Sequence, residues 1–199
     1  MNYIGSKLSL IPFIRAAVED CVGIDLSDRV FCDLFAGTGV VGRSFKSRVR
    51  KVISNDWEYY SYVLNRNYIG NNIALDSQDE LVRELNEMAG VEGGFIFQNY
   101  CYGSGSGRQY FSDENGKKID AIRIQIERWK NNDYISEDMY FFLLATLLES
   151  ADKLANTASV YGAFLKHLKA AAQKSLILEP AYFSTNSNKH EVYCEDANM

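Results

Sequence analysis

The sequence predicts an α/β fold built on a parallel sheet, and two observations lead to this class. Short apolar runs alternate with stretches of helical periodicity, an order typical of parallel strands joined by helices. The segment Phe31–Gly42 passes from a buried strand through a tight loop into a helix, with Gly37, Gly39 and Gly42 in G-x-G-x-x-G spacing. In such a loop the first glycine permits a tight turn, the second lets a ligand approach the backbone, and the third allows close helix–strand packing.

The first part of the chain is expected to supply the alternating elements. Pro12 is tolerated in the first helix because it falls in the first turn. The expected elements are a helix at about 8–22, a strand near 30–34, a helix at about 40–47, a strand near 51–55, and helices at about 58–68 and 78–88.

The middle of the chain is expected to be helical after a glycine- and aromatic-rich stretch at residues 90–107. We expect helices at about 113–130, 137–154 and 156–169, followed by a strand at 175–178. Four apolar residues, Ile119, Ile122, Ile126 and Trp129, have helical spacing. The loop at 100–110, which carries Arg108, is either a nucleic-acid contact or a mobile surface loop, and the second is favoured.

Composition indicates one globular domain of ordinary size. The chain has 199 residues, 47% of them hydrophobic and 13% aromatic. A net charge of −5 argues against strong DNA binding by this segment alone, and no apolar run is long enough to span a membrane. Because the N-terminus has no secretory signal pattern, the expected location is the cytoplasm.

Several side chains are expected to be structural. The cysteines are predicted to be core thiols, and neither histidine has metal-site spacing, so no metal is expected. Two sets of basic residues are predicted to be solvated surface. The cysteines are Cys21, Cys32, Cys101 and Cys194, the histidines His167 and His190, and the basic sets Arg43, Lys46, Arg48, Arg50 and Lys51, and Lys166, Lys169 and Lys174.

Asp33 indicates which ligand the glycine loop would hold. It lies four residues before Gly37, at the mouth of the loop, where a carboxylate repels a phosphate and attracts a cation. S-adenosylmethionine carries an ammonium and a sulfonium group and no phosphate, so this cofactor is favoured over a dinucleotide. The alternative is that Asp33 only caps the turn or the helix.

The end of the next expected strand supports this interpretation. Asp56 follows an apolar run and lies 19 residues after Gly37, where an acid is placed to bind ribose hydroxyls. Trp57 could then lie against an adenine face. The alternatives are a helix cap for Asp56 and a core aromatic for Trp57.

Three separated segments, and a weaker fourth, resemble the D12-type class of adenine-specific DNA methyltransferases, a group that includes many restriction-system modification enzymes. Tyr3–Lys7 resembles the opening motif of that family, Asp33–Gly39 its D-x-F-x-G-x-G cofactor loop, and Ser54–Asp56 its ribose-binding acid. Tyr193–Asn198 is the weaker match. These segments follow one another in the family's order across nearly the whole chain.

The resemblance implies a Rossmann-like S-adenosylmethionine-dependent methyltransferase fold with a helical insertion that meets DNA. Tyr3 and Lys7 would help to hold the cofactor, Lys7 near its carboxylate. Asp196 would recognise its adenine. The backbone of the loop would wrap its methionine part, through Phe35, Ala36, Gly37, Thr38 and Gly39. The reaction of the complete enzyme would be methyl transfer to the N6 nitrogen of adenine in DNA.

The family's catalytic D-P-P-Y sequence is absent from this chain, whose only prolines are Pro12 and Pro180. Glu179-Pro180-Ala181-Tyr182 is a weak substitute, because Glu179 is longer than aspartate, Tyr182 follows an alanine, and the segment precedes Asp196. The chain is therefore expected to be an incomplete, N-terminal part of a methyltransferase, inactive alone, with a missing C-terminal half or partner subunit. An open sheet edge would favour a homodimer.

We therefore expect a cofactor-binding part at 1–75, a helical and loop region at 76–185 and a strand at 186–199 that belongs to the same overall domain. Two other functions remain open. One is a nicotinamide-dependent dehydrogenase that uses the same glycine loop. The other is a non-catalytic subunit or relic.

Overall fold

The chain divides into two compact units in the computed structural model, which describes residues 6–158 and 163–198. Residues 5–74 together with 182–199 form one unit, which we call the sheet unit. Residues 75–181 lie in the other, which we call the helical unit. The helical unit is thus inserted between two parts of the sequence that fold together.

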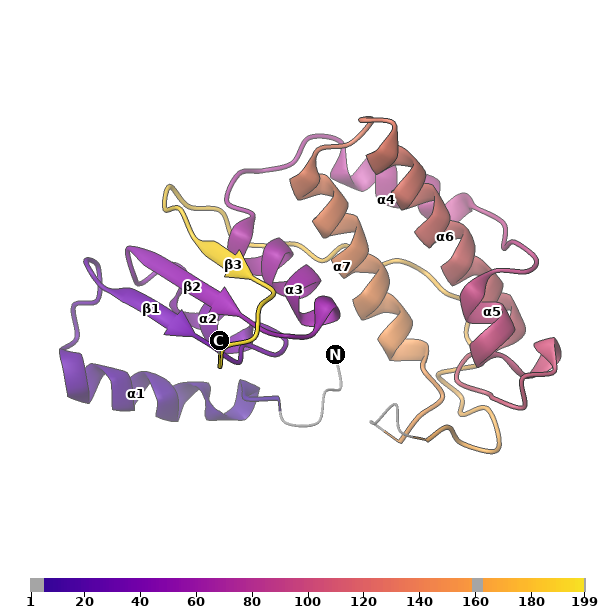
Figure 1. Ribbon diagram of the computed structural model, residues 1–199, viewed down its shortest axis with the longest axis horizontal. Helices are drawn as coiled ribbons and strands as arrows, with labels where there is room; N and C mark the ends of the chain where they lie inside the picture. The colour runs from indigo at the N-terminus through magenta and orange to yellow at the C-terminus, as the bar shows by residue number, and fades with distance from the viewer. Residues whose placement is uncertain (1–5, 159–162, 199) are drawn as a thin grey trace. The chain divides into compact units, whose positions relative to one another are not determined.

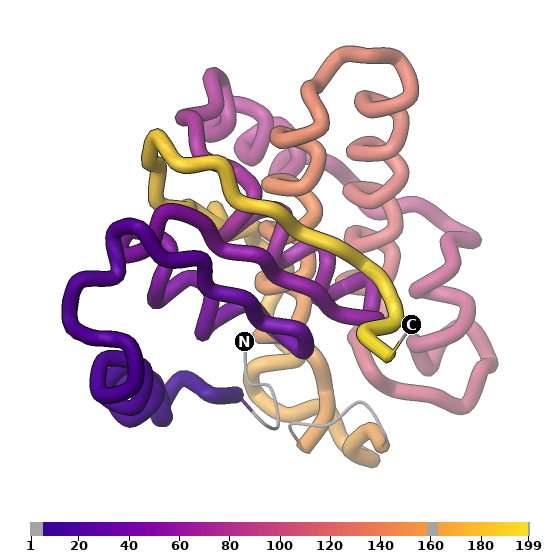
Figure 2. Tube along the Cα trace, turned by 60° about the vertical axis from the view of Figure 1, so that its left-hand side comes forward, coloured from indigo at the N-terminus to yellow at the C-terminus, as the bar shows by residue number. Residues whose placement is uncertain are grey.

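The sheet unit contains three parallel strands, β1 (Val30–Asp33), β2 (Lys51–Asn55) and β3 (Glu191–Tyr193), in the order β1-β2-β3 (Figure 1). Cys32 is in register with Ile53, and Ile53 with Glu191. Figure 2 shows β3, near the end of the chain, lying beside β2. The carboxyl ends of all three strands therefore meet at one edge, and the predicted parallel sheet is confirmed.

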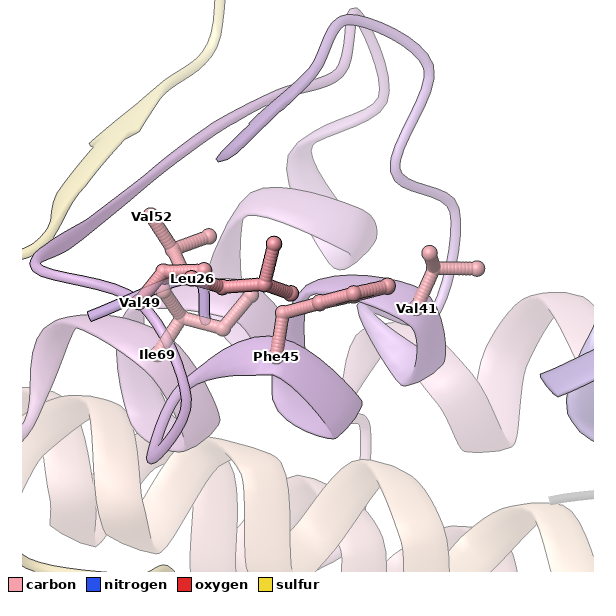
Figure 3. Close-up of a cluster of buried hydrophobic side chains, with 6 residues drawn as sticks. All are labelled: Leu26, Val41, Phe45, Val49, Val52 and Ile69. Atoms are coloured by element: carbon pink, nitrogen blue, oxygen red, sulfur yellow. The ribbon is translucent and has the colours of Figure 1, made fainter. Parts of the chain in front are cut away.

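Three helical elements of this unit pack an apolar layer against the sheet, namely α1 (Ile11–Val22), α2 (Val40–Phe45) and the π-helical turn η2 (Arg66–Gly70). The unit also contains the exposed 3-10 turn η1 (Leu8–Leu10) and α3 (Tyr59–Asn65). Figure 3 shows the buried cluster of Leu26, Val41, Phe45, Val49, Val52 and Ile69. Phe31 of β1 stacks on Phe45 with ring centroids 4.2 Å apart. Burial of this layer supplies the main driving force for folding of the unit.

Gly42 fits the role predicted for the third glycine. A Cβ atom at this position would lie 2.6 Å from Cδ1 of Ile69 and 3.3 Å from Cγ1 of Val52. Only glycine therefore lets α2 approach both β2 and η2 this closely.

The segment that leads into β3 is held by buried polar side chains. Lys46, 1% exposed, donates to the carbonyls of Tyr68 at 3.0 Å, Asn71 at 2.5 Å and Ser184 at 2.7 Å. The Nδ1 atom of His190 accepts from the amide of Val52 at 2.9 Å. The prediction that Lys46 lies on the solvated surface is therefore wrong. The carbonyls that surround its ammonium come from distant parts of the sequence and meet only in the folded chain.

Most of the other basic residues near Lys46 also have partners. Arg48 pairs with Glu19, Lys51 pairs with Glu191, and the guanidinium of Arg43 lies 3.5 Å from the ring centroid of Tyr68. Among the cysteines, Cys101 is buried as predicted. Cys21, Cys32 and Cys194 are exposed free thiols, so the prediction that they are core residues is wrong.

The helical unit is organised around two long helices, α6 (Asp113–Asn131) and α7 (Glu137–Leu154). Each begins at a serine cap: Ser112 accepts from the amide of Asn115 at 3.3 Å, and Ser136 from that of Met139 at 3.2 Å. Shorter elements complete the unit, namely α4 (Gln78–Glu87), α5 (Phe95–Tyr100) and the 3-10 turn η3 (Tyr102–Ser104). The four residues with predicted helical spacing in α6 are all buried.

The glycine- and aromatic-rich stretch at 90–107, for which no element was predicted, contains α5, whose first turn is capped by Asp120 through the amides of Ile96 at 2.9 Å and Phe97 at 2.8 Å. Two predicted elements of this region are corrected by the structure. The predicted helix at 156–169 is absent from its described residues, where Thr157 bridges to Phe164. The side chain of Asn156 donates to two backbone carbonyls there, which competes with a helix.

The second correction concerns the predicted strand at 175–178, which is extended but pairs with no strand among the described residues. Side chains hold its backbone instead. Asn115 accepts from the amide of Leu176 at 2.8 Å, and Asn86 accepts from that of Leu178 at 2.7 Å. An apolar run was the only evidence for a strand, and such a run does not specify which groups will satisfy its backbone.

Within residues 6–158 and 163–198, no helix combines the length and apolar character that a membrane span requires. The cytoplasmic location stays a prediction.

Candidate functional site

The glycine loop lies between β1 and α2 and has left-handed backbone at two positions. Gly37 has φ +53° and Gly39 has φ +73°. The amide of Gly39 donates to the carbonyl of Ala36 at 2.9 Å, and the amide of Ala36 donates to the carbonyl of Asn55 in β2 at 3.0 Å. Ala36 is 2% exposed, and Thr38 is partly buried. The loop is thus a closed turn anchored to the neighbouring strand.

Asp56 braces this loop from the end of β2. Its Oδ2 atom accepts from the amide of Gly37 at 2.7 Å, and its Oδ1 atom accepts from that of Glu58 at 3.0 Å. The carboxylate therefore both supports the glycine loop and starts the turn into α3. Since an ionised carboxylate has about four lone-pair sites, it retains capacity for further donors such as hydroxyls.

Trp57 and Phe35 place exposed aromatic rings on the two segments that meet at this edge. Trp57 is 67% exposed and Phe35 is 64% exposed. A core position, the alternative considered for Trp57, is therefore wrong. An exposed aromatic face beside polar backbone suits the binding of a flat, partly apolar ligand.

Asp33 ends β1 with a carboxylate that is not fully satisfied. Its Oδ2 atom is buried and has no hydrogen-bond partner among the described residues. Burial raises the pKa of Asp33, while Lys7 and the amide of Phe35 oppose this shift and Asp56 adds to it. A buried carboxylate oxygen without a donor is costly, so this position favours a positively charged or hydrogen-bond-donating ligand.

Lys7 reaches the same loop from the N-terminal segment. Its ammonium donates to the carbonyl of Phe35 at 3.3 Å. Tyr3, the other N-terminal residue expected at the site, lies outside the described residues. Lys7 therefore contributes a cationic group beside a loop whose other charged neighbours, Asp33 and Asp56, are acidic.

A layer of polar side chains behind the loop was missed by the sequence analysis. Asn65 donates to the carbonyl of Gly37 at 3.1 Å, and Ser61 donates to the same carbonyl. The hydroxyl of Ser54 in β2 donates to Oδ1 of Asn65 at 2.6 Å. The i,i+4 spacing of Ser61 and Asn65 was the available signal, but polar residues on a helix usually face solvent.

Asp196 follows β3 and lies in a turn of its own. Its Oδ1 atom accepts from the amide and from the side chain of Asn198, both at 2.9 Å, and these bonds lower the pKa of Asp196. The preceding residue, Glu195, bonds to Asn55 at the end of β2. Its amide donates to Oδ1 of Asn55 at 3.0 Å, and its carbonyl accepts from Nδ2 of Asn55 at 3.0 Å. The Asp196 turn is thus attached to β2, the strand that Asp56 directly follows.

The segment Glu179–Tyr182, considered above as a weak substitute for the catalytic motif, lies in different surroundings. Glu179 is exposed in the helical unit and forms an ion pair with Lys153 at 2.6 Å, which lowers the pKa of Glu179. Tyr182, the first residue of the returning part of the sheet unit, is 55% exposed. Glu179 is therefore held as an ionised surface carboxylate, and it does not end a strand.

Together these features define an α/β protein with a candidate ligand site at the carboxyl ends of its parallel strands, where such folds bind nucleotides and related molecules. The chain belongs to the D12 class of N6 adenine-specific DNA methyltransferases, whose family model matches residues 3–199. The resemblance inferred from the motifs is thereby confirmed.

Named relatives agree with this membership. The chain is 64% identical over 199 residues to the Type II methyltransferase M.NlaIII of Neisseria lactamica, with all of this chain and 59% of that protein covered. It is 37% identical over 208 residues to M.FokI of Planomicrobium okeanokoites, covering 32% of it, and 36% identical over 203 residues to M.CviAII of Paramecium bursaria Chlorella virus 1, covering 59%. The chain thus spans between about a third and three-fifths of these proteins. No solved structure matches it significantly.

Proposed function

We propose that this chain is the cofactor-binding part of a DNA adenine-N6 methyltransferase of a restriction–modification system, and that S-adenosylmethionine binds at the glycine loop. The observation that carries the proposal is the buried Oδ2 atom of Asp33 beside that loop, which has no hydrogen-bond partner within residues 6–158 and 163–198. Family membership supports the choice of methyl donor. The three-stranded sheet is, in this proposal, part of a Rossmann-like methyltransferase fold.

The residues present fit the proposed cofactor. The carboxylate of Asp33 would accept from the ammonium group of its methionine part, since a charged donor to a buried carboxylate forms a strong hydrogen bond. Asp56 has lone pairs left for ribose hydroxyls, and Trp57 offers an exposed ring for the adenine. Lys7 would pair with the cofactor's carboxylate. The cofactor supplies the methyl group, and these side chains bind and orient it.

Part of the proposed cofactor site is already held in place by hydrogen bonds within the chain. Gly37 is hydrogen-bonded through both its amide and its carbonyl, so the loop needs little ordering when the ligand arrives. Asp196 lies on a turn tied to β2 and would recognise the cofactor's adenine. We propose that Tyr3 also contacts the cofactor.

Methyl transfer to DNA is proposed for the complete enzyme and not for this chain alone. No D-P-P-Y sequence occurs in the 199 residues. In that family motif the acid and a backbone carbonyl accept from the adenine amino group and the aromatic side chain stacks on the flipped base. The helical unit is the proposed DNA-contacting part. The missing chemistry would come from a further segment or from a partner subunit.

Isothermal titration calorimetry with S-adenosylhomocysteine and with NAD tests the cofactor assignment. We expect binding of S-adenosylhomocysteine and none of NAD, because the carboxylate of Asp33 disfavours a pyrophosphate. Binding of NAD alone would support the dehydrogenase alternative, and binding of neither would support a non-catalytic relic.

A methylation assay tests the second part of the proposal. The purified 199-residue chain is mixed with DNA and radiolabelled S-adenosylmethionine, with a complete D12-class enzyme as positive control. We expect label in DNA only with the control. Incorporation by the chain alone would refute the proposed inactivity and would make Glu179 and Tyr182 the first candidates for substitution.

A further inference from the structure

Asn65 is a buried amide whose hydrogen-bonding groups are directed at the glycine loop and at the elements that carry it. It lies at the end of α3 and is 1% exposed. Its Nδ2 atom donates to the carbonyl of Gly37 at 3.1 Å and to that of Ser61 at 2.8 Å. Its Oδ1 atom accepts from the hydroxyl of Ser54 in β2 at 2.6 Å. One side chain thus connects the loop, the helix and the strand.

Two backbone carbonyls set the orientation of this amide. Because the carbonyls of Gly37 and Ser61 can only accept, the end that faces them is the nitrogen, and the end that meets the hydroxyl of Ser54 is the oxygen. Aspartate, with no donor when ionised, and leucine, with no polar atom, have similar size but cannot make the same contacts. The position therefore requires both a donor and an acceptor.

The loop is complementary to Asn65 in shape as well as in hydrogen bonding. A Cβ atom at Gly39 would lie 2.6 Å from Oδ1 of Asn65, so the second glycine of the motif makes room for this side chain. On its other side, the amide of Gly37 donates to Asp56 at 2.7 Å. The Gly37 peptide groups are thus held from both directions, by Asp56 and by Asn65.

We infer that Asn65 is a positioning residue for the methyl-donor site, because it sets the direction of the Gly37 carbonyl and the path of the glycine loop. The inference rests on the proposed function. A preorganised loop lowers the entropy that the ligand must overcome on binding, so loss of the Nδ2 donor weakens ligand affinity without removing a ligand contact.

The N65D substitution tests this inference through its pH dependence. The introduced carboxyl has almost the same shape, and only its protonated form can donate to the Gly37 carbonyl. Burial and the facing carbonyls raise the pKa of such a carboxyl. Relative to the unsubstituted chain at the same pH, we expect affinity for S-adenosylhomocysteine to fall about tenfold at pH 8 and to recover to within about threefold at pH 6.

Asn115 provides a matched control in the helical unit. It is also a buried amide that bonds only backbone in the described contacts, donating to the carbonyl of Lys174 at 2.8 Å and accepting from the amide of Leu176 at 2.8 Å. N115D is expected to lower the free energy of unfolding and to leave the affinity of the folded chain unchanged at both pH values. A merely structural role for Asn65 would give N65D this same behaviour.

The outcomes separate the inference from the proposed function. Unchanged affinity of N65D, or an equal loss at pH 6 and pH 8, overturns the role of Asn65. No binding by the unsubstituted chain overturns the proposed function and this inference with it. If N65D does not fold, the S54A variant tests the inference instead, because the hydroxyl of Ser54 holds the side chain of Asn65 in place. We expect S54A to weaken affinity about threefold, and unchanged affinity refutes the inference.

Discussion

The two ends of the parallel sheet are both held by buried polar side chains, but the charges differ: a lysine is buried at the amino end and a carboxylate oxygen at the carboxyl end. At the amino end, Lys46 donates to three carbonyls and anchors the segment that leads into β3. At the carboxyl end, a buried oxygen of Asp33 has no partner in the part of the chain that the structure describes, and aromatic rings are exposed. We therefore propose that the amino end serves folding and that the carboxyl end serves the proposed binding of the cofactor.

At both ends of the sheet, burial disfavours the charged form of an ionisable side chain. Burial and Arg43 lower the pKa of Lys46 to about 8, and burial with the nearby Lys46 lowers the pKa of His190 to about 4. These groups are disfavoured in their charged forms by the fold itself. Asp33 is disfavoured in the same way, but a cationic ligand would relieve its penalty.

The largest expected effect is on folding, from K46M. Removal of the charged donor that three carbonyls share is expected to lower the free energy of unfolding by about 3 kcal/mol. Urea denaturation measures this change. K51M is the control, because Lys51 pairs with Glu191 on the partly exposed surface and its loss is expected to cost below about 1 kcal/mol. Equal losses for the two variants would refute an anchoring role for Lys46.

The next effect is on the glycine loop, from G39A. A methyl group must enter left-handed backbone at φ +73° and approach Asn65, so we expect about 2 kcal/mol lower stability and at least about tenfold weaker binding of S-adenosylhomocysteine. G23A is the control, since Gly23 has φ +90° with no atom within 4 Å of the added carbon. G23A is expected to lose stability alone, and loss of affinity in G23A would contradict a local effect.

D33N separates binding from folding at the carboxyl end. The amide removes a buried charge, so stability of the ligand-free chain is expected to stay within about 1 kcal/mol or to rise, while affinity for S-adenosylhomocysteine falls about tenfold. Thermal denaturation and calorimetry measure the two quantities, with the exposed Asp28 substituted as D28N for comparison. A large loss of stability with unchanged affinity would assign Asp33 to folding instead.

The smallest expected effect is the pH dependence from His190. Its pKa is about 4 in the folded chain and about 6.5 when unfolded, so the unfolded state takes up the proton first as pH falls. Stability from this group is present above pH 6.5 and declines towards pH 4, by about 1 kcal/mol after allowance for solvent screening. We expect H190Q to flatten the curve of unfolding free energy against pH, and H167Q, at an exposed histidine, to leave it unchanged.

Elements with a strong local pattern were predicted to the residue. The strand at 51–55 and the helix at 137–154 coincide with β2 and α7. The first helix was predicted to begin at residue 8, but a 3-10 turn occupies Leu8–Leu10 and α1 starts at Ile11, one residue before Pro12. Local periodicity sets where an apolar face lies, whereas helix ends depend on capping groups that periodicity does not contain.

The site was predicted where its residues form a motif and missed where they do not. Asp33, Gly37, Gly39 and Asp56 follow from spacing and from chemistry along the chain. Asn65 and Ser54 belong to no motif, and their role depends on α3 packing behind the loop. The α5 cap by Asp120, 23 and 24 residues from its partners, was missed for the same reason.

The sequence alone thus determined the parallel α/β class, the glycine loop with its two acids and the methyltransferase family, because these features are local in the chain. The tertiary structure alone decided that Lys46 is buried, that residues 175–181 bond to helix side chains, and that Asn65 faces Gly37. Each of these depends on which groups meet after long loops close. Backbone donors and acceptors must find partners in the folded state, and no pattern of neighbouring residues specifies those partners.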